Sequence, residues 1–123
     1  MRSLSVLVFL AAAVGTHAGS RTATLTGWFS DKGCASGRTN SGVYTATNPD
    51  CARRCIEKGS PVVFIAETEK AIYVVKDYAA AKDDLGYKIE VTATVDDEGK
   101  TIAVQSVKRL EAVVLSCSRA KAK

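Results

Sequence analysis

Residues 87–107 read YKIEVTATVDDEGKTIAVQSV, and this stretch decides the fold class. Apolar and polar side chains alternate over residues 88–95, which is the pattern of a strand with one buried face. The polar run 96–100 contains a glycine and is typical of a turn, and apolar side chains resume over residues 102–107. The stretch therefore predicts two strands joined by a short turn.

Three more strands are predicted upstream. Residues 22–29 alternate and are rich in β-branched and aromatic side chains. Residues 62–66 and 71–76 are apolar runs separated by four polar residues, the pattern of a hairpin. Between this hairpin and the last two strands, the alanine-rich residues 78–85 predict one or two helical turns.

A short helix and a long loop lie between the first two strands. Asn48 is a good N-cap, Pro49 suits the first helical position and Gly59 suits the C-terminal cap, so we expect a helix over residues 49–58. Residues 30–47 are rich in Gly, Ser, Thr and Asn and predict a loop without secondary structure. A loop of this length is usually functional or held by a crosslink.

Together these elements predict a mainly β fold, a small OB-fold-like five-stranded barrel with one or two short helices. The alternative is an open antiparallel sheet with the helix packed on one face, because strand order is not readable from the sequence. A chain of 123 residues is one domain at most. We expect that domain over residues 19–110 and a C-terminal tail over 111–123.

The N-terminus has the pattern of a secretory signal peptide. Arg2 precedes an apolar run over residues 4–14, and small residues at Thr16 and Ala18 favour cleavage after Ala18. A membrane-spanning helix needs about 20 apolar residues, more than this run offers. We therefore predict a signal peptide over residues 1–18, a secreted or periplasmic protein, and no stable membrane insertion after cleavage.

Composition excludes several classes of function. Removal of residues 1–18 takes the only histidine, His17, so that no Ser-His-Asp or Cys-His catalytic pair remains. The formal net charge of the chain is +4, and removal of Arg2 lowers it by one. This charge is too small to indicate a nucleic-acid surface. We expect no enzyme, no catalytic residue, no cofactor and no nucleic-acid partner.

The four cysteines are Cys34, Cys51, Cys55 and Cys117, and an even count in an exported protein favours disulfides. Cys51 and Cys55 lie four residues apart on one face of the predicted helix, where a bond between them constrains little. A bond from Cys34 to this helix would close the long loop and stabilise the fold by roughly 3 kcal/mol. Cys117 then bonds the remaining cysteine, stays free or joins a partner.

Three segments resemble a group of small exported bacterial proteins of unknown function. They are GWFSDKGC at residues 27–34, DCARRCIEKGSPVVFI at 50–65 and the stretch at 87–107. In this group a Gly-x-x-x-Asp-x-x-Cys segment precedes a Cys-x-x-x-Cys helix ending in Gly, and OB-like strands follow. The resemblance implies an exported compartment and an OB-like fold. Members often carry a histidine before the first helix cysteine, where this chain has Asn48 and Pro49, so a metal site does not carry over.

Our first functional hypothesis is a disulfide-stabilised binding module of the bacterial envelope. OB-type surfaces commonly bind oligonucleotides or oligosaccharides, and aromatic rings stack on such ligands. The partner is then a small ligand, a glycan or an envelope protein. The candidate stacking residues, each of which also suits ordinary sheet packing, are Trp28, Tyr44, Tyr73 and Tyr87.

The alternative hypothesis is a thiol-based function, either redox or binding of a soft metal. Cys34, Cys51 and Cys55 supply three thiols, and Asp31 is a possible fourth ligand. Structural zinc sites usually take two pairs of closely spaced ligands, and here only one such pair exists. The sequence therefore assigns no residue as a metal ligand.

Overall fold

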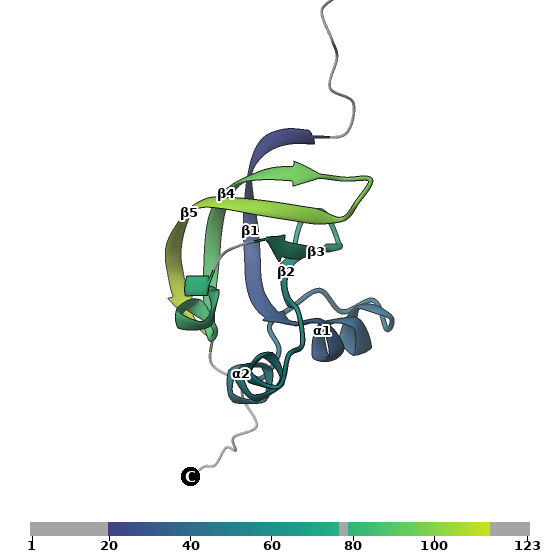
Figure 1. The fold of residues 1–123 in the computed structure, drawn as a ribbon, viewed down its shortest axis with the longest axis vertical. Coiled ribbons are helices and arrows are strands. Elements are labelled where there is room, and N and C mark those ends of the chain that lie inside the picture. The colour runs from purple at the N-terminus through teal and green to yellow at the C-terminus, as the bar shows by residue number, and fades with distance from the viewer. Residues whose placement is uncertain (1–19, 77–78, 114–123) are drawn as a thin grey trace, which may run out of the picture.

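Five strands close into a barrel in the computed structural model, which describes residues 20–76 and 79–113 (Figure 1). The order around the barrel is β1-β2-β3-β5-β4, and every pair is antiparallel except β3 with β5. The strands are β1 (Ser20–Asp31), β2 (Val62–Ala66), β3 (Ala71–Lys76), β4 (Tyr87–Asp96) and β5 (Thr101–Ala112). The predicted mainly β, five-stranded barrel is confirmed, and the open-sheet alternative is wrong.

The barrel closes because β1 pairs along its length with two partners. Its first part pairs with β4 and its second part with β2, and Gly27 is in register with both Ile89 and Ala66. A β-carbon at Gly27 would lie 1.8 Å from the backbone oxygen of Ile65. Glycine is therefore required at the point where β1 passes from one partner to the other.

The interior of the barrel is filled by the inward side chains of the alternating strands. In β4 every second residue is fully buried, as the alternation of the sequence predicts: Ile89, Val91, Ala93 and Val95. Phe64, Tyr73 and Ile102 join them from the other strands in one apolar cluster. Ala52 belongs to the same cluster, so the helix that carries it packs over one end of the barrel.

That helix, α2 (Pro49–Glu57), begins where the sequence predicts and ends one residue earlier. The Asn48 side chain accepts hydrogen bonds from the backbone N–H groups of Asp50 and Cys51 at 3.0 and 3.1 Å. Gly59 follows the helix with a φ of +103°, a value that favours glycine. The helical turns predicted before β4 are a 3₁₀ segment, η1 (Ala79–Asp84).

The loop predicted over residues 30–47 is wrong, because it contains a second helix, α1 (Lys32–Thr39). The composition of α1 is poor for a helix, and its stability comes from its surroundings. Asp31 caps its N-terminus, and Ala35 is fully buried against the outer face of the barrel. There Ala35 belongs to a second apolar cluster with Trp28, Val63 and Ile65, the outer cluster.

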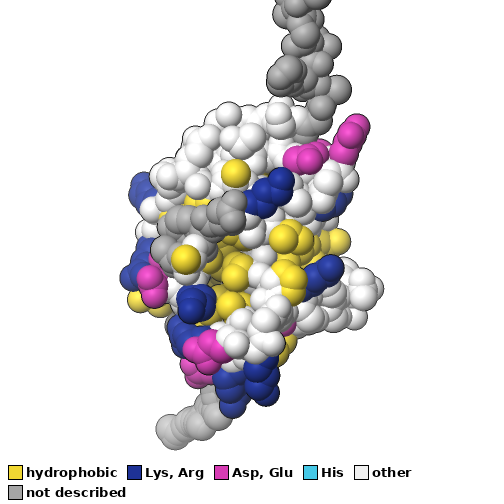
Figure 2. All heavy atoms as spheres, in the orientation of Figure 1, with side chains coloured by type: hydrophobic (Ala, Val, Ile, Leu, Met, Phe, Trp, Pro, Cys, Tyr) yellow, Lys and Arg dark blue, Asp and Glu magenta, His cyan; other side chains and the backbone are white. Residues whose placement is uncertain are grey.

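The last strand extends past residue 107, where the sequence predicted its end. The last strand continues to Ala112, past residue 110, and the backbone N–H of Val113 donates to the Gly86 oxygen at 2.7 Å. The predicted signal peptide, residues 1–18, lies outside the described residues. Within residues 20–76 and 79–113, no helix combines the length and apolarity needed to cross a membrane. Figure 2 shows that apolar side chains reach the surface in the centre of one face, with Lys and Arg side chains around them.

Candidate functional site

Two places in the described residues bring chemically active side chains together: a cluster of two thiols and a carboxylate, and a pocket beside Trp28. In the first, a carboxylate oxygen of Asp31 and the Sγ atoms of Cys34 and Cys55 all lie within 4.8 Å of one another. Asp31 is 1% exposed, whereas both cysteines are half-buried. We call these three residues the thiol-carboxylate cluster.

One carboxylate oxygen of Asp31 caps a helix, and the other has no hydrogen-bond partner within the described part of the chain. It is the last residue of β1 and the N-cap of α1, where its Oδ2 accepts a hydrogen bond from the backbone N–H of Cys34 at 3.0 Å. Its buried Oδ1 has no hydrogen-bond partner among the residues that the structure describes. Buried carboxylate oxygens are nearly always hydrogen-bonded, so this one is exceptional.

The start of α2 is tied to the end of β1, which brings Cys55 to the cluster. The buried hydroxyl groups of Ser30 and Thr47 form a hydrogen bond with each other, and Thr47 directly precedes the N-cap of α2. The backbone N–H of Lys32 donates to the Pro61 oxygen at 3.0 Å. These contacts hold both ends of the segment that carries α2 against the beginning of α1.

The environment of Cys34 suppresses its ionisation. Hydrogen bonding to Asp31, burial and the negative charge of Asp31 raise the pKa of the Cys34 thiol to about 12. The thiolate is the reactive form of cysteine, and a raised pKa lowers its share at neutral pH.

The structure distinguishes the two helix cysteines. Cys34, Cys51 and Cys55 are all free thiols in it, and Cys55 is the one whose sulfur joins Cys34 and Asp31. The crosslink from Cys34 to this helix therefore stays a prediction. Cys117 lies outside the described residues.

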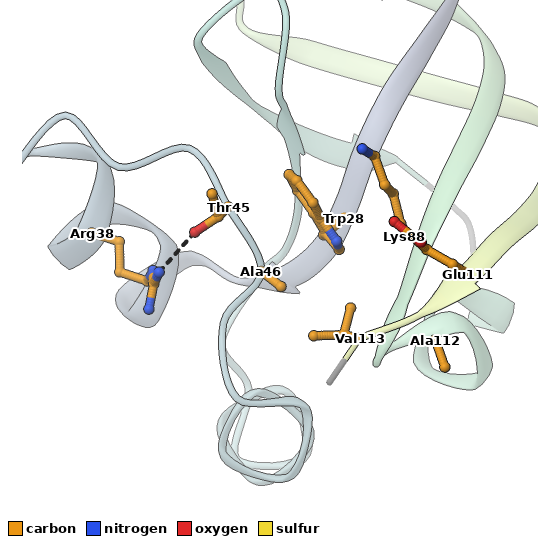
Figure 3. A pocket seen from close by; sticks show the side chains of 8 residues that line it. All are labelled: Trp28, Arg38, Thr45, Ala46, Lys88, Glu111, Ala112 and Val113. Atoms are coloured by element: carbon orange, nitrogen blue, oxygen red, sulfur yellow. Dashed lines mark hydrogen bonds between the residues drawn. The ribbon is translucent and has the colours of Figure 1, made fainter. Parts of the chain in front are cut away.

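The second place is a pocket of about 440 Å³ on the outside of the barrel (Figure 3). It lies between α1, the segment that leads to α2, and the neighbouring ends of β1, β4 and β5. Its walls are both apolar and charged, and the lining residues are Trp28, Arg38, Thr45, Ala46, Lys88, Glu111, Ala112 and Val113.

Trp28 forms the aromatic wall of the pocket. The indole is 9% exposed because it also packs in the outer cluster, and the Lys88 Nζ lies 5.5 Å from its ring centroid. Lys88 also forms a salt bridge of 3.0 Å with Glu67. Arg38 Nη2 donates to the Thr45 Oγ1 at 2.7 Å, and Arg38 makes no ion pair with any described residue. The pocket thus offers an aromatic ring and an unneutralised guanidinium.

The three tyrosines named with Trp28 lie elsewhere. Tyr44 packs against the outer cluster, with the Lys70 Nζ 5.9 Å from its ring centroid. Tyr73 is 2% exposed in the core, and Tyr87 packs against that core with the Arg109 guanidinium carbon 4.2 Å from its ring centroid. None of the three lines the pocket.

Sequence reasoning missed most of the pocket. Arg38 lies in the segment that was expected to be a loop, and Lys88 is an ordinary polar residue of an alternating strand. No local pattern distinguishes either residue from other surface cations. Comparison with protein-family models, with curated proteins and with solved structures found no match for this chain.

Proposed function

We propose that this protein is an exported binding module and that its ligand occupies the pocket beside Trp28. The observation that carries the proposal is a pocket of about 440 Å³ that combines an aromatic wall with an unneutralised arginine. Sites for small molecules are typically clefts of about 300–1,000 Å³ with apolar walls and a few polar groups. The export is inferred from the N-terminal pattern of residues 1–18.

Arg38 is the lining cation without an ion pair among the described residues, and it favours a ligand with an acidic group, although the Glu111 carboxylate also lines the pocket. Lys88 is neutralised by Glu67, whereas Arg38 donates to a neutral hydroxyl and keeps its other N–H groups for a ligand. A guanidinium matches the geometry of a carboxylate or phosphate. The indole of Trp28 suits the face of a sugar or aromatic ring. We therefore infer a ligand with a ring and an acidic substituent, such as an acidic glycan fragment.

Trp28 is the single tryptophan of the chain, so its fluorescence reports on the pocket directly. The experiment titrates the protein with matched neutral and acidic oligosaccharide fragments and follows the tryptophan emission. We expect saturable changes with acidic fragments and weaker changes with their neutral counterparts. A lack of saturable change with every fragment would contradict the proposal.

The matched variants are Arg38→Gln and Arg54→Gln. Both arginines are exposed and lie on neighbouring helices, but only Arg38 lines the pocket. A hydrogen bond to a charged group contributes about 1.5–3 kcal/mol, so Arg38→Gln should weaken binding by about 10- to 100-fold. Arg54→Gln should leave it unchanged. Equal effects of the two variants would indicate a general charge effect rather than this pocket.

A further inference from the structure

We propose that the thiol-carboxylate cluster, Asp31, Cys34 and Cys55, binds a divalent cation of the zinc class. The cluster is lined by different residues from the Trp28 pocket, and the proposal is independent of the ligand proposed there. Two observations carry it: the convergence of three donor atoms, and the buried Asp31 oxygen without a partner.

The donor set matches the chemistry of this cation. Zinc binds cysteine sulfur at about 2.3 Å and carboxylate oxygen at about 2.0–2.2 Å, usually in a tetrahedron. Donors in such a site lie roughly 3.5–3.8 Å apart. The donor atoms of Asp31, Cys34 and Cys55 lie within 4.8 Å of one another. Rotation of the cysteine side chains that moves each sulfur by about 1 Å would bring them to the separation found in such a site. With three protein ligands the fourth position belongs to water, and both cysteines are partly open to solvent.

The Asp31 carboxylate divides its two oxygens between two tasks. Oδ2 caps α1 through the backbone N–H of Cys34, which fixes the side chain, and Oδ1 is left without a donor at a residue that is 1% exposed. No salt bridge of the described residues involves Asp31. A cation bound to Oδ1 would satisfy the oxygen and balance the buried negative charge. Binding replaces the proton of each ligating thiol with the cation and releases that proton to solvent.

A disulfide between Cys34 and Cys55 does not meet the same need. A disulfide has no S–H group, so it offers no hydrogen to the carboxylate and leaves Oδ1 unsatisfied. The cluster is therefore better explained as a ligand set than as a crosslink.

The proposed site does not need the two pairs of closely spaced ligands that structural zinc sites usually have. Among the described cysteines only Cys51 and Cys55 are close in sequence, but the site does not use that pair. It takes one thiol from α2, one from the first turn of α1, and the carboxylate at the end of β1.

The test measures Zn²⁺ binding to the full chain, reduced and stripped of metal, by competition with a chromophoric chelator. Wild type is expected to bind one ion per chain. Asp31→Asn, Cys34→Ser and Cys55→Ser should each weaken binding by at least about tenfold. Asn is as good an N-cap as Asp, so Asp31→Asn should stay folded, which circular dichroism checks.

Cys51→Ser is the matched control, because Cys51 lies on the same helix but outside the cluster. This variant, Cys117→Ser and Arg38→Gln should bind Zn²⁺ like the wild type. Co²⁺ gives a second readout, since thiolate-to-cobalt charge transfer should be present in the wild type and Cys51→Ser and reduced in Cys55→Ser. Three results would each overturn the proposal: no stoichiometric binding by the wild type, unchanged binding in Asp31→Asn, or a Cys34–Cys55 disulfide in protein isolated without reductant.

Discussion

Gly27 approaches the backbone of Ile65 so closely that a β-carbon at residue 27 would lie 1.8 Å from the Ile65 carbonyl oxygen. The two residues lie on β1 and β2, at the position where β1 is paired with β2 and β4 at once. The contact is with backbone, which cannot move aside as a flexible side chain can. The closure of the barrel therefore depends on the absence of a side chain at residue 27.

Gly27→Ala should destabilise the protein by about 3 kcal/mol or more, because the added methyl group forces β1 and β2 apart. Chemical denaturation of both proteins measures the difference in free energy of unfolding. Gly37→Ala is the control, since a β-carbon at Gly37 in α1 meets nothing within 4 Å. This control should be neutral or stabilising by up to about 1 kcal/mol. A similar loss in both variants would contradict the close approach at Gly27.

Ser30 and Thr47 should be energetically coupled, because their hydroxyl groups form a hydrogen bond and both are buried. Thr47→Val leaves the Ser30 hydroxyl without this partner and should cost about 1–3 kcal/mol. The double variant Ser30→Ala/Thr47→Val should cost less than the sum of the single variants, because no unpaired hydroxyl remains. Urea denaturation of the four proteins gives the coupling energy. Strict additivity would show that the two hydroxyl groups do not interact.

Asp97 should make the stability of the protein depend on acid pH. It accepts hydrogen bonds from Arg21 at 2.7 Å and from the Tyr73 hydroxyl at 3.0 Å, and these bonds lower the pKa of its carboxyl group. Because the folded-state pKa is the lower one, the contribution is fully present above the unfolded-state pKa of about 3.9. It is lost as the pH falls through the folded-state pKa.

The melting temperature of Asp97→Asn should therefore be below that of the wild type at about pH 7, and this difference should shrink by about pH 2–3. Glu98→Gln is the control, because the exposed Glu98 side chain makes no hydrogen bond or ion pair with the described residues. The melting temperature of Glu98→Gln should be close to that of the wild type at about pH 7 and at about pH 2–3. A difference for Asp97→Asn that persists in acid would contradict the assignment of the shift to Asp97.

Arg109 should contribute to stability although it lies near the C-terminal end of β5. Its Nε donates to the Asp84 carboxylate at 2.7 Å, and Asp84 is 8% exposed. Arg109→Gln removes the partner of a buried carboxylate and should lower the free energy of unfolding, measured by chemical denaturation. The neighbouring Lys108→Gln, at an exposed residue without such a contact, should cost less than about 0.5 kcal/mol. Equal losses would indicate that the Arg109–Asp84 pair is not stabilising.

The five strands could be predicted from the sequence because the signal for a strand is local, although β5 continues to Ala112, past its predicted end at residue 107. Side chains of successive strand residues point to opposite faces, so burial of one face appears directly as alternation, as in Ile89 and Val91. The predicted bounds of β2 and β3 agree with the structure to the residue. The N-cap of α2 at Asn48 is equally local, because a cap bonds backbone groups two and three residues away.

Helix α1 was missed because its stability is not local. Its sequence, KGCASGRT, has the composition of a loop, and the Asp31 cap is its one local helix signal; the burial of Ala35 against the barrel supplies the rest. Neither the barrel surface nor its distance from Ala35 can be read from these eight residues.

The two candidate sites depend on the tertiary structure. The sequence indicated Asp31, Cys34, Cys51 and Cys55 as candidate metal ligands. Cys51 and Cys55 lie on one face of the same helix, so spacing alone does not distinguish them. Only the docking of α2 against β1, through Ser30 and Thr47, selects Cys55. The pocket likewise joins side chains from α1 and three strands that are distant in the chain. Contacts across such separations depend on how whole elements pack, a relationship that no window of the sequence contains.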